Sequence, residues 1–242
     1  MDIASYQKRI YKKIEFGSYL GHRFFKIFPY LNSLKNPKIL DLGCGEGQFY
    51  DILKLYKKDF SYIGVDISEK HVEKAERKGL NVTIHDVSKK LPFESHTFDV
   101  IIASEIIEHL FDTDAFLKEC HRLLKKEGLL VLATPNIASK GNRIGLLFGK
   151  RPGAIDCRVT KSLGHIRAFV KKDIIILFRE NGFSIISLMG KDFNLPFMKY
   201  GTKLEFINEF FCKLFPTLSS GFIVIAKPKD NLKSQNDAIL NL

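Results

Sequence analysis

A Glu-x-x-Glu-His motif at residues 105–109 places two carboxylates and an imidazole within five positions. One turn of helix over this stretch would bring Glu105, Glu108 and His109 to one side of the chain. Imidazoles with a near-neutral pKa serve as general bases at physiological pH. His109 is therefore the first candidate for a catalytic base, and His165 is the second. The alternative for His109 is a packed histidine at a helix start.

A second stretch suited to chemistry is a Gly-x-Gly-x-Gly turn, which follows the apolar run of residues 39–42. A helix-compatible stretch, residues 48–56, comes next, so the pattern predicts a buried strand, a tight turn and a helix. Glycines there permit positive φ and let a ligand approach the backbone. The N–H groups at the helix start favour a negatively charged or polar group. The glycines of the turn are Gly43, Gly45 and Gly47.

Two carboxylates follow the next predicted strands. Residues 62–68 predict a second strand, and Asp66 lies nineteen residues after Gly47. In a doubly wound sheet this position lies at the carboxyl edge beside the glycine turn, where a carboxylate can accept hydrogen bonds from ribose hydroxyls. Residues 80–87 predict a third strand, which contains Asp86 near its end. The glycine spacing differs from the dinucleotide Gly-x-Gly-x-x-Gly pattern because position 48 is Gln.

The glycine turn, with Asp41 ahead of it and Asp66 after it, resembles the cofactor-binding signature of the class I S-adenosylmethionine-dependent methyltransferases. The resemblance extends, with decreasing precision, from about residue 38 to residue 227. It implies an α/β fold whose doubly wound, seven-stranded, mostly parallel sheet has the order 3-2-1-4-5-7-6, with strand 7 antiparallel. It also implies S-adenosylmethionine as cofactor and S-adenosylhomocysteine as product. The cofactor-binding residues that it implies are Asp41, Gly43, Cys44, Gly45, Gly47, Asp66, Ile67, Asp86, Val87, Ser104 and Glu105.

The fourth strand, predicted at residues 100–103, ends where the reactive sulfonium lies in this fold. The sequence after it has neither an Asn/Asp-Pro-Pro-Tyr/Phe tetrapeptide nor a Pro-Cys nucleophile, which argues against methylation of base amines or of cytosine carbon. A four-residue set instead resembles the metal ligands of the small-RNA 3′-end ribose methyltransferases, and ubiquinone-pathway O-methyltransferases show a related cluster. This resemblance implies a divalent ion that binds acceptor oxygens. The set is Glu105, Glu108, His109 and His165.

The remaining elements define the expected domain organisation. We expect a helix at residues 112–126 and strands at residues 128–136, 184–190 and 220–226, with a helix at residues 171–181 before the sixth strand. The expected units are an N-terminal helical lid (1–36), a Rossmann-like domain (37–228) and a flexible tail (229–242). Two inserted segments are expected to cap the site, at 137–167 and 197–215.

Composition limits the class of protein and its partners. The chain has 242 residues and a net charge of +11, and its basic excess lies mainly in residues 1–38 and 140–172. Such segments favour a negatively charged partner, although a solvated lysine-rich surface explains them equally well. The four cysteines show no metal spacing, no apolar run reaches about 18 residues, and the N-terminus lacks a signal-peptide core. We therefore expect a cytoplasmic protein.

Three functions are compatible with these patterns. The first is an O-directed methyltransferase acting on a small molecule or a glycan or lipid precursor. The second is an RNA ribose or tRNA methyltransferase that uses the basic flanks. The third is a non-catalytic protein that shares the cofactor-binding fold. Peripheral membrane contact through the N-terminal helices or the apolar part of residues 137–167 is a variant of the first function. The oligomeric state and the acceptor are not predicted.

Overall fold

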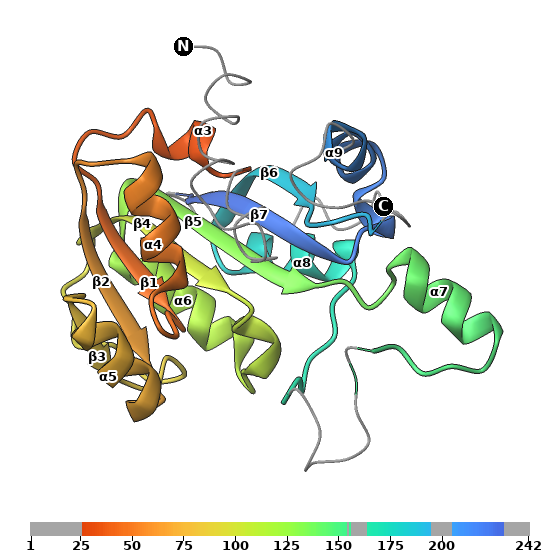
Figure 1. Ribbon diagram of the computed structural model, residues 1–242, viewed down its shortest axis with the longest axis horizontal. Coiled ribbons are helices and arrows are strands. Elements are labelled where there is room, and N and C mark those ends of the chain that lie inside the picture. The colour runs from red at the N-terminus through yellow and green to blue at the C-terminus, as the bar shows by residue number, and fades with distance from the viewer. Residues whose placement is uncertain (1–25, 154, 156–163, 195–204, 230–242) are drawn as a thin grey trace.

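The structure is a computed structural model that describes residues 26–153, 155, 164–194 and 205–229. A seven-stranded sheet runs through these residues in the order β3-β2-β1-β4-β5-β7-β6 (Figure 1). Strands β1 to β5 pair in parallel, whereas β7 is antiparallel to both β5 and β6. The predicted fold class and strand order are therefore confirmed. The strands are β1 Lys38–Leu42, β2 Ser61–Asp66, β3 Val82–Ile84, β4 Phe98–Ser104, β5 Leu124–Pro135, β6 Phe183–Gly190 and β7 Gly221–Pro228.

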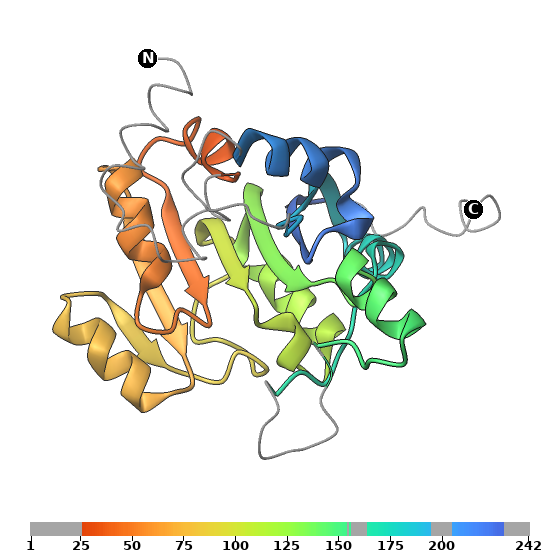
Figure 2. The same ribbon diagram turned by 45° about the vertical axis from the view of Figure 1, so that its right-hand side comes forward.

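Helices cover both faces of the sheet, as Figures 1 and 2 show. Helices α3, α4 and α5 contribute to the apolar core of one face, and α6 and α8 contribute to the core of the other. Helix α7 projects away from the sheet and has no buried residue. The helices are α3 Phe28–Leu31, α4 Gln48–Tyr56, α5 Glu69–Arg77, α6 Thr113–Leu123, α7 Lys140–Leu147, α8 Lys171–Glu180 and α9 Glu205–Leu214, with 3-10 turns η1 Ile107–His109 and η3 Pro216–Leu218.

Strand β1 shows how the apolar pattern builds this sandwich. Successive side chains of a strand point to opposite faces. Leu40 and Leu42 belong to the core beneath α6 and α8, whereas Ile39 belongs to the core beneath α4. Asp41 falls on the α4 face by the same alternation, and it is 3% exposed there. An acidic residue therefore lies within the apolar layer immediately before the glycine turn.

Several element boundaries differ from those predicted. The helix expected at 112–126 ends at Leu123, because β5 begins at Leu124 and pairs there with Phe98. The third strand is shorter than predicted, because only Val82–Ile84 pair with β2 at this edge of the sheet. Residues 1–25 of the expected lid, residues 197–204 of the second expected cap and residues 230–242 of the tail lie outside the described residues. None of the described helices has the length and apolar character needed to cross a membrane.

Candidate active site

The β1–α4 turn requires glycine for its backbone conformation. Gly43, Gly45 and Gly47 have φ values of 72°, 55° and 82°, a region that side chains disfavour. Gly47 is also the N-cap of α4, and a Cβ placed there would lie only 2.3 Å from Leu80 Cδ2. Position 47 therefore disfavours a side chain for two reasons, the positive φ and the contact with Leu80. The turn leaves the amino end of α4 facing the carboxyl edge of the sheet, as the sequence predicted.

Strand β2 holds the glycine turn in place. The N–H groups of Gly43 and Cys44 donate to the carbonyl of Val65 at 2.8 Å and 3.0 Å. The N–H of Gly45 donates to Asp66 Oδ2 at 2.8 Å, while Asp66 Oδ1 accepts from the N–H of Ser68 at 2.9 Å. Asp66 therefore fixes the turn as well as lying beside it. Each carboxylate oxygen retains a further lone pair for a ribose hydroxyl.

The neighbouring strand ends extend this edge. Ile67 follows Asp66 with 68% of its surface exposed, which leaves an apolar side chain available to pack against a ligand. Asp86 follows β3, and its Oδ1 accepts from the N–H of Ser88 at 2.9 Å. Hydrogen bonds from Ser88 hold the pKa of Asp86 below its ordinary value. Val87 is buried. Asp66, Ile67 and Asp86 thus lie along the side of the turn where the cofactor was predicted.

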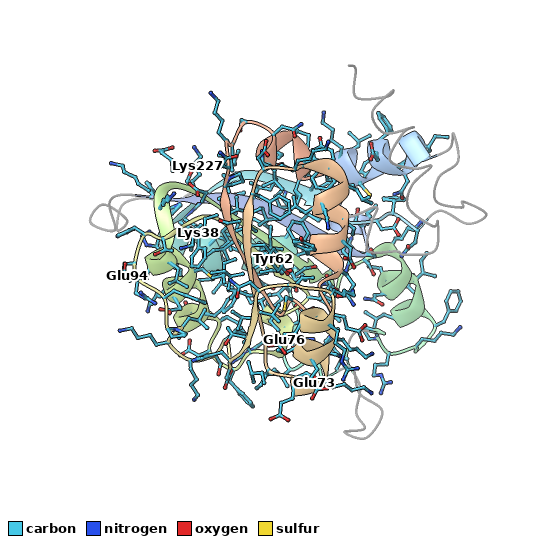
Figure 3. The ribbon with its side chains drawn as sticks, turned by 60° about the vertical axis from the view of Figure 1, so that its left-hand side comes forward. Lys38, Tyr62, Glu73, Glu76, Glu94 and Lys227 are labelled. Atoms are coloured by element: carbon cyan, nitrogen blue, oxygen red, sulfur yellow. The ribbon has the colours of Figure 1, made fainter. Side chains whose placement is uncertain are left out.

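Asp41 and Cys44 are less available to a ligand than the other predicted contacts. Asp41 accepts a hydrogen bond from Tyr62 Oη at 2.7 Å. Burial raises the pKa of Asp41 to about 7, although the Tyr62 hydrogen bond acts in the opposite direction. Figure 3 labels Tyr62 near α4, and Tyr62 belongs to the core beneath that helix. Burial also raises the pKa of the Cys44 thiol. The cofactor contacts of Asp41 and Cys44 stay predictions.

The end of β4 has an unusual backbone and an unusual ion pair. Glu105 adopts a left-handed conformation with φ 56°, and its N–H donates to the carbonyl of Ala133 at 2.8 Å. Glu105 Oε1 lies 2.7 Å from Lys191 Nζ, and the Lys191 side chain is only 5% exposed. The Ser104 hydroxyl is buried and has no hydrogen-bond partner among the described residues. Polar groups therefore collect where the sequence placed the reacting centre.

Glu108, His109 and His165 form a compact group beside this strand end. One potential ligand atom from each lies within 4.8 Å of the others. Glu108 is 1% exposed, and its Oε2 accepts from Thr134 Oγ1 at 3.0 Å. Its Oε1 lies 4.0 Å from His165 Nε2 but accepts no hydrogen bond from the described part of the chain. A buried acceptor atom without a donor faces the two imidazoles.

The protonation of this group is set by its surroundings. Burial and the nearby charge of Glu105 together raise the pKa of Glu108 to about 7, although the hydrogen bond from Thr134 and the charge of Lys191 lower it. The rings of His109 and His165 lie 4.8 Å apart at 70°. His109 Nδ1 lies 3.1 Å from the carbonyl of Gly164. A proton on Nδ1 would donate to that carbonyl, which leaves Nε2 with a lone pair for a ligand.

The structure brings together three members of the predicted four-residue cluster, and Glu105 lies outside the group that they form. The sequence argument assumed one helical turn from position 105. The chain instead takes a left-handed residue at Glu105 and begins the 3-10 turn η1 at Ile107, so the Glu105 side chain is directed to Lys191. Lys191 was not predicted. It lies 86 positions away along the chain, and its local sequence carries no signal of this contact.

Comparisons with known proteins identify the family of this chain. The sequence model of a family described as a methyltransferase domain matches residues 40–132. The ubiquinone biosynthesis O-methyltransferase of Pelagibacter ubique is 32% identical over 178 residues, which cover 71% of this chain and 71% of that protein. The mitochondrial ubiquinone biosynthesis O-methyltransferase of Homo sapiens is 28% identical over 173 residues, which cover 67% of this chain and 45% of that protein.

Solved structures support the same fold. An S-adenosylmethionine-dependent methyltransferase from Archaeoglobus fulgidus matches with a TM-score of 0.61 and 22% identity, over 93% of this chain and 100% of that one. A possible histamine N-methyltransferase from Thermotoga maritima matches with a TM-score of 0.60 and 22% identity, over 94% of this chain and 95% of that one. With the glycine turn and Asp66 in place, the chain is a methyltransferase that belongs to the class I S-adenosylmethionine-dependent methyltransferase superfamily.

Proposed function

We propose that the chain methylates an oxygen atom of a small-molecule acceptor. The observation that carries this proposal is the group formed by Glu108, His109 and His165, with near-neutral titration of Glu108 and two imidazoles within reach. The group adjoins the end of β4, and β4 is paired with β1 up to the contact between Leu42 and Ala103. A hydroxyl acceptor needs a base, which this group supplies. The two ubiquinone-pathway relatives, which are O-methyltransferases by name, favour the same reaction.

The residues of the site have separate roles in the in-line transfer of a methyl group. The cofactor, when bound, supplies an electrophilic methyl group on its sulfonium. The glycine turn, Asp66 and Ile67 would hold the nucleoside part of the cofactor. An acceptor hydroxyl must lose its proton as it is methylated, and an imidazole of this group would take that proton. We assign that role to His109 first and to His165 second, with the carboxylate of Glu108 stabilising the positive charge that forms.

As an alternative to an imidazole base, we propose that Glu108, His109 and His165 hold a divalent metal ion, with both imidazoles as its ligands. One carboxylate oxygen and two imidazole nitrogens suit such ions, and the buried Glu108 Oε1 without a hydrogen-bond donor is the atom that a cation would satisfy. A bound ion would supply Lewis-acid polarisation of acceptor oxygens. We expect dialysis against a chelator to abolish methyl transfer and added Mg²⁺ or Mn²⁺ to restore it. Activity that is unchanged by the chelator contradicts the metal proposal alone.

An acceptor-sized cavity lies at the end of β5, the strand that pairs with β4. Its volume is about 370 Å³, within the range of small-molecule sites. The Nζ atom of Lys140 lies 4.4 Å from the centroid of the Phe193 ring, and both residues line the cavity. Pro135 also lines it and directly follows Thr134, the hydrogen-bond donor to Glu108. We propose this cavity as the acceptor site. Its lining is Pro135, Asn136, Ser139, Lys140, Gly141, Asn142, Phe193, Asn194, Leu218 and Ser220.

The proposed function is tested by labelled methyl transfer. Purified protein and S-adenosylmethionine labelled in the methyl group are incubated with separate small-molecule and RNA fractions of a cell extract. We expect label in a small molecule as an alkali-stable methyl ether, lost in His109→Ala and Glu108→Gln. Glu94→Gln, a change at an exposed loop position, is the matched control for a carboxylate substitution (Figure 3). Label in RNA, or in an N-methyl product, contradicts the proposal.

We propose peripheral contact with an anionic membrane through α7. Leu147 and Phe148 are 82% and 75% exposed. Residues 137–155 contain no acidic side chain, so these apolar groups are accompanied only by basic ones. We expect the protein to float with phosphatidylglycerol vesicles but not with phosphatidylcholine vesicles. Leu147→Glu should remove the binding and Leu55→Glu, an exposed position on α4, should not; equal flotation of both variants contradicts the role of α7.

We propose a cytoplasmic location from the state of the thiols. Cys44, Cys120 and Cys212 are buried and unpaired in the described part of the chain. Reduced cysteines are typical of a reducing compartment. Fractionation of cells that express a tagged full-length chain should recover it with cytoplasmic or inner-leaflet material. Recovery from an oxidising compartment contradicts this assignment.

A further inference from the structure

Lys191 reaches across the carboxyl edge of the sheet to the reacting centre. It directly follows β6, an edge strand of the sheet, yet its Nζ lies 2.7 Å from Glu105 Oε1 at the end of β4. Strands β7 and β5 separate β6 from β4. The side chain therefore passes over two strand ends to make this contact. Its near-complete burial shows that the protein encloses it along that path.

The surrounding backbone is built to hold this side chain. The N–H of Lys191 donates to the carbonyl of Gly221 at 2.8 Å, and its own carbonyl accepts from Lys26 Nζ at 3.1 Å. Gly221 has no side chain in the way, since a Cβ there would lie 2.9 Å from Lys191 Cδ. A buried lysine is costly unless it is paired with an opposite charge. Glu105 is that partner.

Lys191 is paired with Glu105, the acidic residue of the Glu-x-x-Glu-His motif that lies outside the proposed metal-binding group. Glu108, His109 and His165 bring their ligand atoms together, and Glu105 is not among them. Glu105 and Lys191 nevertheless lie close enough to Glu108 to shift its pKa in opposite directions. The ammonium group of Lys191 and a divalent ion are both cations that a carboxylate can bind. They therefore compete for the same side chain.

We propose that Lys191 is a positioning residue that withholds Glu105 from the metal and thereby limits the affinity of the site for divalent ions. The inference rests on the proposed metal site. With Lys191 in place, the ion meets one carboxylate and two imidazoles. Without its ammonium group, Glu105 turns toward Glu108 and supplies a second carboxylate. A second carboxylate ligand tightens the binding of a divalent ion. Removal of the Lys191 ammonium group therefore strengthens the metal site, although Lys191 is not itself a ligand.

Mn²⁺ titration of the full-length protein at pH 8, by calorimetry and by electron paramagnetic resonance of the free ion, tests this competition. We expect Lys191→Met to bind Mn²⁺ at least tenfold more tightly than the wild type. Glu105→Gln should bind Mn²⁺ no more tightly than the wild type, because it offers no second carboxylate and leaves the charge of Lys191 beside the site. The double variant Lys191→Met/Glu105→Gln should return to the wild-type affinity, which assigns the gain to Glu105.

The control variant is Lys227→Met, which removes one positive charge from a lysine paired with Glu127 on the surface. It corrects for the general effect of net charge on cation binding. Lys191→Arg, which keeps the charge, should retain the wild-type affinity if the thermal midpoint shows that it folds. The proposal is overturned if Lys191→Met binds no more tightly than Lys227→Met, or if its gain persists in the double variant.

A further outcome separates this inference from the proposed function. Binding of S-adenosylhomocysteine is measured for every variant in the same calorimetric series. If no variant binds Mn²⁺ at millimolar concentration while S-adenosylhomocysteine still binds, the metal site and the role of Lys191 both fail, and the methyltransferase assignment stands. If S-adenosylhomocysteine does not bind either, the proposed reaction fails with them.

Discussion

The two halves of the carboxyl edge differ in how their polar groups are satisfied. On the cofactor half, the turn amides of Gly43, Cys44 and Gly45 all donate to β2, and both oxygens of Asp66 accept from the backbone. On the acceptor half, Ser104 Oγ and Glu108 Oε1 are buried without hydrogen-bond partners among the described residues. The first half is preorganised by its own hydrogen bonds. The second leaves polar atoms to be satisfied by what binds there.

Substitutions in the two halves should therefore differ in their effects on stability and on binding. Alterations of the hydrogen-bonded residues of the cofactor half disturb a network that also belongs to the sheet, so they should affect folding and binding together, whereas loss of the exposed Ile67 side chain should affect binding alone. Substitutions in the acceptor half remove buried charges that destabilise the folded state. They should therefore stabilise the protein while they impair the reaction. Four predictions test this expectation, from the largest effect to the smallest.

Gly47→Ala should have the largest effect. The new Cβ would lie 2.3 Å from Leu80 Cδ2, in a residue with φ 82°. Backbone strain and overpacking together should cost about 3–4 kcal/mol of stability and reduce binding of S-adenosylhomocysteine by more than 100-fold. Urea unfolding and calorimetry measure the two effects. The control is Gly79→Ala, which has φ 78° but no atom within 4 Å and should show the strain alone.

The pH dependence of stability should report one buried acid from each half. Burial raises the pKa of Asp41 from 3.8 and of Glu108 from 4.5, each to about 7. The folded state therefore binds these protons more tightly than the unfolded chain does. The contribution of each carboxyl group to stability is thus greatest below about pH 4. It falls as the pH rises to about 7, by at most about 3–4 kcal/mol for each.

Substitution separates the two contributions. Asp41→Asn and Glu108→Gln should each flatten the decline in the urea midpoint between pH 4.5 and pH 8. Mn²⁺ at pH 8 should restore stability in Asp41→Asn, which retains the metal-binding group, but not in Glu108→Gln. An unchanged pH profile in both variants contradicts the assignment of these protons.

Asp66→Asn should weaken the cofactor half without changing its shape. The amide retains one oxygen for the N–H of Gly45 or of Ser68 but loses the charge that strengthens these bonds and those to the ribose. We expect S-adenosylhomocysteine to bind about 10- to 100-fold more weakly, as calorimetry would show. Asp51→Asn, a change at an exposed carboxylate of α4, is the matched control. Equal losses in both variants contradict the role of Asp66.

Ile67→Ala should have the smallest effect. The side chain is 68% exposed, so its truncation should leave the urea midpoint unchanged. Loss of its apolar contact with the nucleoside should weaken S-adenosylhomocysteine binding by about fivefold, equivalent to about 1 kcal/mol. Ile84→Ala, which removes another half-exposed apolar group, should bind normally. A fall in stability in Ile67→Ala without a change in affinity contradicts the predicted contact.

The sequence predicted the cofactor half well because its signals are local. A strand, three glycines and a helix start are consecutive in the chain, and Asp66 is placed by the regular crossover to the next strand. The acceptor half depends on contacts that local patterns do not contain. Glu105 was expected on a helical turn, but its left-handed backbone and its contact with Lys191 arise from the packing of β4 against distant segments.

The sequence also did not predict which residues form buried hydrogen bonds with the acidic residues. Alternation in β1 placed Asp41 on the α4 face, but its acceptance of a hydrogen bond from Tyr62 depends on the register between β1 and β2. The third strand was predicted too long for a similar reason. Residues with strand propensity form a strand only where a partner is present, and at this edge β2 pairs with three of them.

The anchoring of the glycine turn to β2 has a consequence for how the protein exchanges amide hydrogens with heavy water. The N–H groups of Gly43, Cys44 and Gly45 are exposed by opening of the strand pair and not by motion of the loop itself. Their deuterium uptake should therefore be as slow as that of Val65. The backbone of the turn should therefore keep its conformation until β1 and β2 separate.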